Sequence, residues 1–81
     1  MKVSIKFFAS AKQAAGVDNK SFNVNSAEEL VTEIRILGGE KLIRIIESSS
    51  VLNNGKRVNI FKDFELKDNL YLEVLPPFAG G

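Results

Sequence analysis

A capping box between stretches of alternating residues limits the fold of this chain more than any other feature of its sequence. Ser26 is followed three residues later by Glu29. The serine hydroxyl can accept a hydrogen bond from the Glu29 amide while the glutamate carboxylate reaches back to the Ser26 amide. A helix is predicted to begin here and to end at Gly38-Gly39 in a left-handed stop. Its apolar face comprises Leu30, Val31, Ile34 and Leu37. We interpret Glu28 and Glu29 as a cap and as complements of the helix dipole, not as paired catalytic carboxylates.

The residues on both sides of this helix alternate as half-buried strands do. In the stretch 2–9, one side carries Val3, Ile5 and Phe7, and the other carries Ser4, Lys6 and Phe8. The stretch 20–24 is a second strand, expected to pair with the first. The stretch 70–75 is the last strand, with Leu70, Leu72 and Val74 inward and Tyr71, Glu73 and Leu75 outward.

Shorter signals complete the order of elements. Residues 10–15 and 40–48 are compatible with short helices. Asn54-Gly55 separates two β-compatible runs and predicts a hairpin with a type I′ turn, which needs positive φ at both central positions. Residues 66–69 predict another turn. The sequence leaves open whether Phe61 or Phe64, both in the aromatic stretch before this turn, belongs to the core.

The order of strands and helices predicts an α+β fold. A single domain covering residues 1–81 is expected, because no internal repeat and no linker divides the sequence. In such an order the main helix packs across one face of a mixed, four- to five-stranded sheet. The first two strands are expected to be antiparallel neighbours, and the helix is expected to cross over to the later strands.

The residue types present exclude most catalytic chemistry. The chain has no cysteine and no histidine, which removes most nucleophilic triads, most zinc sites and the usual general base. The formal net charge is +1 and the basic residues are scattered, so we expect no nucleic-acid partner. No apolar run approaches the roughly 18 residues that a membrane helix needs, and Lys6 interrupts a stretch that superficially resembles a signal peptide. We expect a cytoplasmic protein that binds no metal, no cofactor and no membrane.

The sequence closes with LPPFAGG, in which two prolines follow the last apolar run and two glycines stand at the end. Proline fixes φ and favours an extended neighbour, so Pro76-Pro77 are expected to end the sheet and to direct the chain away from the body. Glycine has no Cβ, so Gly80-Gly81 can enter a channel too narrow for any side chain. Residues 78–81 are therefore predicted to form a flexible tail.

Four stretches together resemble one family along nearly the whole chain. They are KVSIKFFASAKQAAG, SAEELVTEI, LKDN and, above all, LEVLPPFAGG. The chain resembles the small subunit of molybdopterin synthase (MoaD) and related sulfur carriers of the ubiquitin-like superfamily, which implies a β-grasp fold. One departure is Asp68-Asn69-Leu70 where the family pattern reads Asp-Gly-Asp, which puts partner contacts near that turn in doubt.

The resemblance implies a carrier that is not itself catalytic. An adenylating enzyme of the E1 type consumes ATP to activate Gly81, a sulfur donor converts the adenylate to a thiocarboxylate, and the large synthase subunit passes the sulfur to a pterin precursor. Gly80 and Gly81 would then be the reactive end. The partner-binding residues are predicted to be Phe8 and Leu75, which strand parity puts on the outer face, with Pro76, Pro77 and Phe78.

Other readings stay open. An activated Gly81 also suits a ubiquitin-like protein modifier conjugated to lysines, and a carrier for thiamine synthesis or tRNA thiolation shares the same chemistry. The usual thiamine-pathway ending lacks the Pro-Pro pair. A plain β-grasp interaction module leaves that pair unexplained. The sequence does not distinguish a molybdenum from a tungsten pathway.

Overall fold

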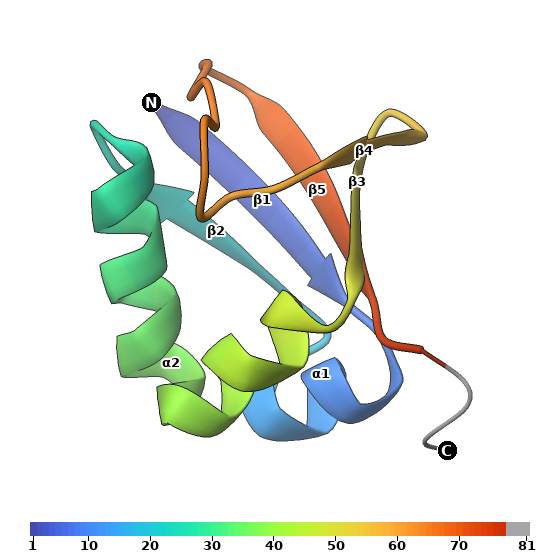
Figure 1. Ribbon diagram of the computed structural model, residues 1–81. Coiled ribbons are helices and arrows are strands. Elements are labelled where there is room, and N and C mark those ends of the chain that lie inside the picture. Colours follow the sequence, from blue (N-terminus) through green and yellow to red (C-terminus); the bar gives the residue numbers. More distant parts are fainter. Residues whose placement is uncertain (78–81) are drawn as a thin grey trace.

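The computed structural model describes residues 1–77 as a five-stranded sheet whose one face is covered by two helices (Figure 1). The strand order is β2-β1-β5-β3-β4. The strands are β1 (Lys2–Phe7), β2 (Asn19–Asn23), β3 (Ser50–Asn53), β4 (Lys56–Val58) and β5 (Leu70–Leu75). The helices are α1 (Ala9–Ala15) and α2 (Ala27–Glu47). The predicted α+β fold with a mixed sheet is confirmed. The predicted tail, residues 78–81, lies outside the described residues.

The middle of the sheet is a parallel pair. β1 pairs antiparallel with β2, and the hydroxyl oxygens of Ser4 and Ser21 lie 3.1 Å apart across that pair. On its other side β1 runs parallel to β5, with Ile5 opposite Leu72. β3 is antiparallel to both β5 and β4. A parallel pair needs a long crossover, and the segment that contains α2 supplies it.

Strand parity is confirmed, but the first strand is shorter than predicted. The six residues expected to point inward from β1 and β5 are all buried, namely Val3, Ile5, Phe7, Leu70, Leu72 and Val74. β1 ends at Phe7, whereas the alternation continued to Ala9. Phe8 keeps an extended backbone as the N-cap residue of α1, and Ala9 turns the chain with φ of 51°. Alternation alone therefore placed the end of the strand two residues too late.

The predicted capping box is present with one changed partner. The Oγ of Ser26 accepts a hydrogen bond of 3.1 Å from the Glu29 amide. The Glu29 carboxylate accepts one of 3.1 Å from the amide of Asn25 instead of Ser26. The reciprocal bond thus reaches one residue further back than predicted.

The two glycines of α2 produce a bend instead of a complete stop. Gly39 has φ of 71° and ψ of −170°, and helical structure resumes directly afterwards. In Figure 1 the first half of α2 runs alongside the sheet and the second half turns to run beneath it. Gly38 lies so close to α1 that an added Cβ would be 2.9 Å from the carbonyl oxygen of Ala14. The short helix predicted after the glycines is therefore the second arm of α2.

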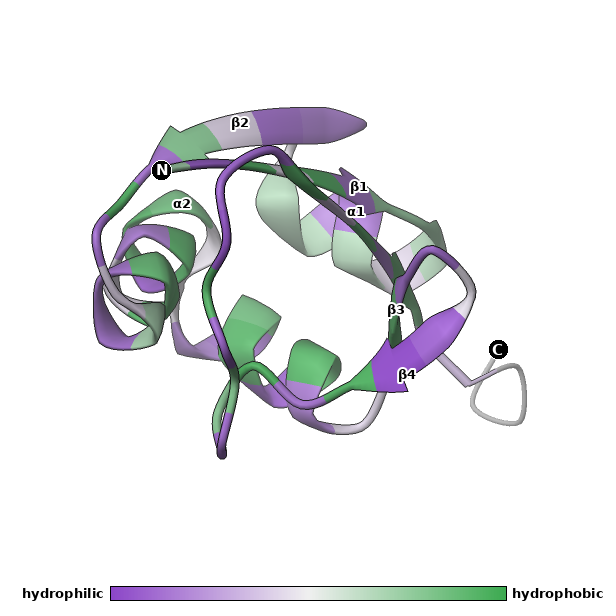
Figure 2. Cartoon of the chain, turned by 90° about the horizontal axis from the view of Figure 1, so that it is seen from above, coloured by the Kyte–Doolittle hydropathy of each residue, from purple (hydrophilic) through white to green (hydrophobic). Residues whose placement is uncertain are grey.

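The edge strands are more polar than the centre of the sheet. Figure 2 colours most of β4 and the first half of β2 as hydrophilic. Lys20 of β2 lies opposite Ile5 and is exposed, so a charge sits on the core side of this edge. Charged residues on edge strands discourage pairing with another chain.

The hairpin and the following segment resolve the question left open by the sequence. Asn54 and Gly55 have φ of 50° and 81°, as a type I′ turn requires. In the segment between β4 and β5, Ile60 is buried, Phe64 packs partly buried against the core, and Phe61 is 38% exposed. Phe64 is therefore the aromatic residue that packs against the core. The predicted turn at 66–69 is also present, with Asn69 at φ of 62°.

No helix in the described residues is both long enough and apolar enough to span a lipid bilayer.

Candidate functional site

The parallel pairing of β1 and β5 brings the two predicted docking residues together. Phe7 lies opposite Val74, and the amide of Phe8 donates a hydrogen bond of 3.2 Å to the Val74 carbonyl. Phe8 and Leu75, the residues that follow this pair, therefore lie side by side at the same end of the sheet. Both side chains are half-buried, and strand parity puts both on the face opposite the core. Each thus leaves part of its apolar surface accessible to a partner.

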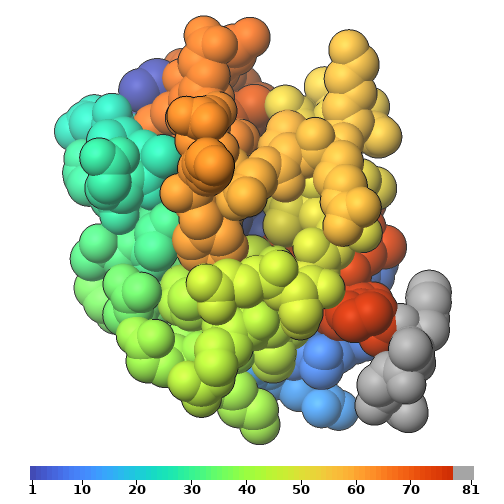
Figure 3. All heavy atoms as spheres, in the orientation of Figure 1, coloured from blue at the N-terminus to red at the C-terminus, as the bar shows by residue number. Residues whose placement is uncertain are grey.

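The chain leaves the sheet directly beside this pair. Pro76 is buried and Pro77 is exposed, so only the second proline of the pair presents surface. Figure 3 shows the end of β5, in red, at the surface of the molecule. The other predicted site residues, Phe78, Gly80 and Gly81, lie outside the described residues.

Two further apolar side chains extend this surface. Leu52 of β3 is half-buried, and Tyr71 of β5 is 44% exposed. Together with Phe8 and Leu75 they form what we call the outer-face patch. Exposed apolar groups gathered on one surface mark sites of protein interaction. Sequence reasoning missed Leu52 because the register of β3 is needed to show which of its residues face outward.

A row of charged side chains crosses the patch. The register aligns Lys6 of β1 with Glu73 of β5, Glu73 with Leu52, and Leu52 with Arg57 of β4. The ammonium nitrogen of Lys6 lies 5.4 Å from the centre of the Phe8 ring, within the range of a cation–π contact. The patch therefore carries fixed charges within its apolar surface.

Two observations concern the acidic side chains of the described residues. Within residues 1–77, no three acidic side chains come close enough together to hold a metal ion. A hydrogen bond from the Lys2 amide holds the pKa of the Asp68 carboxyl below its usual value. That carboxylate is exposed and lies in the turn before β5, at the opposite end of the strand from Pro76. It therefore supports the turn at the start of β5 and lies at the far end of that strand from Leu75.

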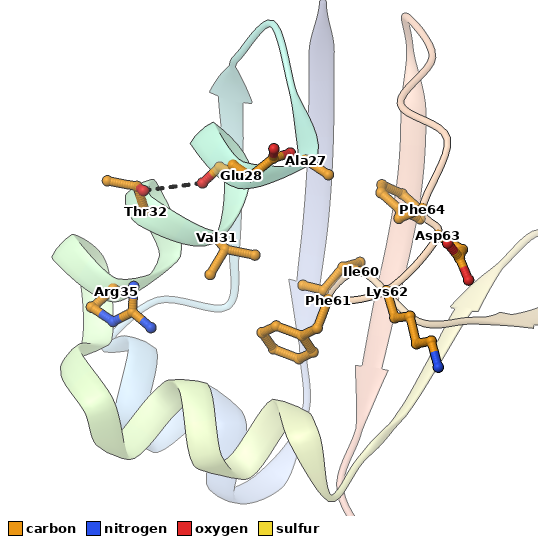
Figure 4. A pocket seen from close by; sticks show the side chains of 10 residues that line it. All are labelled: Ala27, Glu28, Val31, Thr32, Arg35, Ile60, Phe61, Lys62, Asp63 and Phe64. Carbon is orange, nitrogen blue, oxygen red and sulfur yellow. Dashed lines mark hydrogen bonds between the residues drawn. The ribbon is translucent and has the colours of Figure 1, made fainter.

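A groove of about 480 Å³ lies on the helix side of the sheet (Figure 4). It runs between the first arm of α2 and the segment 60–64, and the Thr32 hydroxyl on its helix wall donates a hydrogen bond of 3.0 Å to the Glu28 carbonyl. Its apolar walls include Val31, Ile60 and Phe61. None of the predicted site residues that the structure describes lines this groove, and neither do Leu52 and Tyr71, so it is separate from the outer-face patch.

Comparisons with known proteins identify the family through solved structures. No protein-family model and no curated protein sequence matches the chain. A structure described as molybdopterin converting factor, subunit 1, from Pyrococcus furiosus is 30% identical, with a TM-score of 0.74 over 95% of this chain and 98% of that one. Subunit 1 from Helicobacter pylori, solved as a complex of subunits 1 and 2, is 26% identical, with a TM-score of 0.69 over the full length of both chains.

A third structure extends the likeness to protein modifiers. Small archaeal modifier protein 1 from Haloferax volcanii has a TM-score of 0.78 over the full length of both chains at 18% identity, which shows a shared fold. The sequence resemblance and the structural matches agree along the whole chain. The protein therefore belongs to the family of ubiquitin-like sulfur carriers that includes subunit 1 of the molybdopterin converting factor.

Proposed function

We propose that this chain is the small, sulfur-carrying subunit of molybdopterin synthase and that Gly81 carries the sulfur as a thiocarboxylate. The observation that supports the proposal most is the 30% identity to the Pyrococcus furiosus subunit 1 over 95% of the chain. The Helicobacter pylori relative, solved together with subunit 2, supports a large synthase subunit as the partner.

The proposed chemistry begins with activation of the terminal carboxyl group. An α-carboxylate is ionised at neutral pH and is a poor electrophile. In the activating enzyme, an oxygen of the Gly81 carboxylate attacks the α-phosphate of ATP and pyrophosphate leaves. Hydrosulfide (HS⁻) then attacks the carbonyl carbon of the acyl adenylate, AMP leaves, and the resulting thioacid loses its proton. The product is a thiocarboxylate, which the large subunit can use as its sulfur source.

In this proposal the folded body serves to position the tail. The outer-face patch lies beside Pro77, so a partner that covers the patch also meets the chain where it leaves the sheet. Gly81 is four residues beyond Pro77, and an extended segment of that length spans at most roughly 14 Å. The reaction centre of each partner must therefore lie within that distance of Pro77 when the patch is covered.

Intact-mass measurement tests the proposal directly. The chain is incubated with the adenylating enzyme of its own organism, ATP and sulfide, and its C-terminus is then fragmented. We expect one sulfur atom in place of one oxygen at Gly81, and no change when ATP is omitted. An unchanged mass with an enzyme that is active on another carrier would contradict the proposal.

A protein modifier is the second candidate, because the fold also matches small archaeal modifier protein 1. The same activated Gly81 would then form an amide with a lysine of another protein, and AMP would leave. Products larger than this chain that yield Gly-Gly-modified lysines on digestion would favour the modifier role. Sulfur transfer to thiamine or tRNA precursors is distinguished from transfer to a pterin by adding each acceptor with its own transferase.

A further inference from the structure

The outer face of the sheet carries an excess of positive charge. By strand parity its charged side chains are Lys2, Lys6, Arg57 and Glu73. Three of these are cations and only Glu73 is an anion. Glu73 carries a single negative charge, so it can neutralise only one of the three cations. A partner that covers this face must therefore contend with uncompensated positive charge.

Lys6 lies where that charge meets the apolar part of the face. Its ammonium nitrogen sits over the ring of Phe8, 5.4 Å from the ring centre. The described part of the chain contains two ion pairs, Lys12 with Asp18 and Arg35 with Glu40, and Lys6 takes part in neither. Glu73 lies directly across from Lys6 in the register, yet the ammonium group is directed to the ring. Within residues 1–77, Lys6 thus covers an apolar side chain with a charge that pairs with no carboxylate.

A partner cannot contact the Phe8 ring closely without moving or burying this ammonium group. Burying an unpaired charge is costly, whereas burying one that is hydrogen-bonded to a carboxylate is tolerated. An apolar partner surface without an acidic group would therefore be rejected, and one with a carboxylate opposite Lys6 would be accepted. Repulsive elements of this kind are a common source of specificity at interfaces.

We infer that Lys6 is a specificity-determining residue of the outer-face patch, and that the partner which docks there presents a carboxylate beside its apolar contact to receive the Lys6 ammonium. This inference rests on the proposed function, because the partner it concerns is the large synthase subunit. The surface of that partner is then expected to be apolar where it contacts Phe8 and Leu75 and acidic where it contacts Lys6.

Calorimetric titration of the full chain with the large subunit, at low and at high salt, tests the inference. Lys6→Met keeps most of the apolar stem and removes the charge, and we expect binding about tenfold weaker, as for the loss of a charge-assisted hydrogen bond. The salt dependence of the remaining affinity should also fall. Lys6→Glu should bind more weakly still, and Lys6→Arg should bind like the native chain. Lys20→Met, at an exposed site on the other side of the sheet, is the matched control and should change nothing.

The outcomes separate the inference from the function on which it rests. Native affinity and native salt dependence in Lys6→Met would overturn the inference alone. Tighter binding by Lys6→Met would overturn it as well, because Lys6 would then only obstruct Phe8. A native chain that binds neither the large subunit nor the activating enzyme would overturn the inference together with the proposed function. If replacing one acidic residue of the large subunit by lysine restores the binding of Lys6→Glu, that acidic residue is the carboxylate that receives Lys6.

Discussion

The backbone amide of Lys2, at the start of β1, donates a 2.6 Å hydrogen bond to Oδ1 of Asp68, in the turn before β5. This bond joins residues 66 positions apart and fixes the start of β5 beside the central strand. It is also the first cause of the lowered pKa of Asp68, followed by a second backbone hydrogen bond from Asn69 and the nearby N-terminal ammonium group. The turn keeps its shape because Asn69 adopts φ of 62°, where the family pattern has glycine.

Asp68→Asn is expected to destabilise the protein in a pH-dependent way. The folded state lowers the pKa of Asp68 from 3.8, so the ionised carboxylate stabilises the fold at every pH above that ordinary value. The contribution is lost as pH falls through the lowered pKa, because the carboxyl group is then protonated in both states. Urea midpoints should differ between native chain and variant at neutral pH and should converge in acid. Asp63→Asn, at an exposed site in the preceding segment, is the control. A difference that grows as pH falls would contradict the assignment.

Gly38→Ala is expected to destabilise the fold by about 1 to 3 kcal/mol through overpacking. The new Cβ would lie 2.6 Å from the Cβ of Leu42 and 2.9 Å from the carbonyl oxygen of Ala14. Leu42 is fully buried, so neither neighbour can move into solvent. Denaturant unfolding measures the loss. Glu33→Ala, at an exposed site on the same helix, should stay within about 0.5 kcal/mol of the native chain. Equal stability of Gly38→Ala and the native chain would show that Gly38 does not pack tightly against Leu42 and α1.

Phe8→Asp and Leu75→Asp are expected to weaken binding to the large subunit at least tenfold while the domain still folds. Truncating a central apolar anchor of an interface commonly costs about 2 kcal/mol or more, and a carboxylate would add desolvation. Both side chains are half-buried and neither is enclosed, so the fold should tolerate the change. Ile36→Asp is a demanding control, because Ile36 is 74% exposed on α2, away from the patch. If Ile36→Asp weakened binding and the patch variants did not, the docking face would be the helical one.

Local signals predicted the elements well because short-range chemistry specifies them. Alternation fixed which residues of β1 and β5 point inward, and Asn54-Gly55 fixed the hairpin. Where a neighbour in space decides the outcome, the sequence was insufficient. The Glu29 carboxylate accepts a hydrogen bond from the amide of Asn25 instead of Ser26. The helix continues beyond Gly39 instead of ending there. The segment from Asn59 to Leu66 has no periodicity, so parity offered no means to rank Phe61 against Phe64.

The same distinction applies to the site. Parity placed Phe8 and Leu75 on the outer face, but only the parallel register of β1 and β5 makes them neighbours. The position of Lys6 over the Phe8 ring depends on a side-chain rotamer, which no pattern of residue types encodes. Pro76 was expected to contact a partner, yet it is buried where the chain leaves the sheet. Its burial results from tertiary packing, which a tail motif does not specify.

Changing the length of the chain at Gly81 is expected to abolish sulfur transfer without affecting docking. An attacking group tolerates a misplacement of only about 1 Å before the rate falls by roughly a hundredfold, and one residue adds or removes about 3.3 to 3.6 Å of extended chain. A chain lacking Gly81, or carrying one added residue after it, should therefore form little or no thiocarboxylate. Its unfolding midpoint and its affinity for the large subunit through the outer-face patch should match the native values.

Intact mass after incubation with the activating enzyme, ATP and sulfide measures thiocarboxylate formation at Gly81, and calorimetry measures the affinity for the large subunit. Gly80→Ala is the matched variant of unchanged length, and it tests whether a side chain as small as a methyl group already blocks the channel. Full sulfur loading of the extended chain, with no protease present to trim it, would contradict the carrier role and leave the interaction module as the better account of this fold.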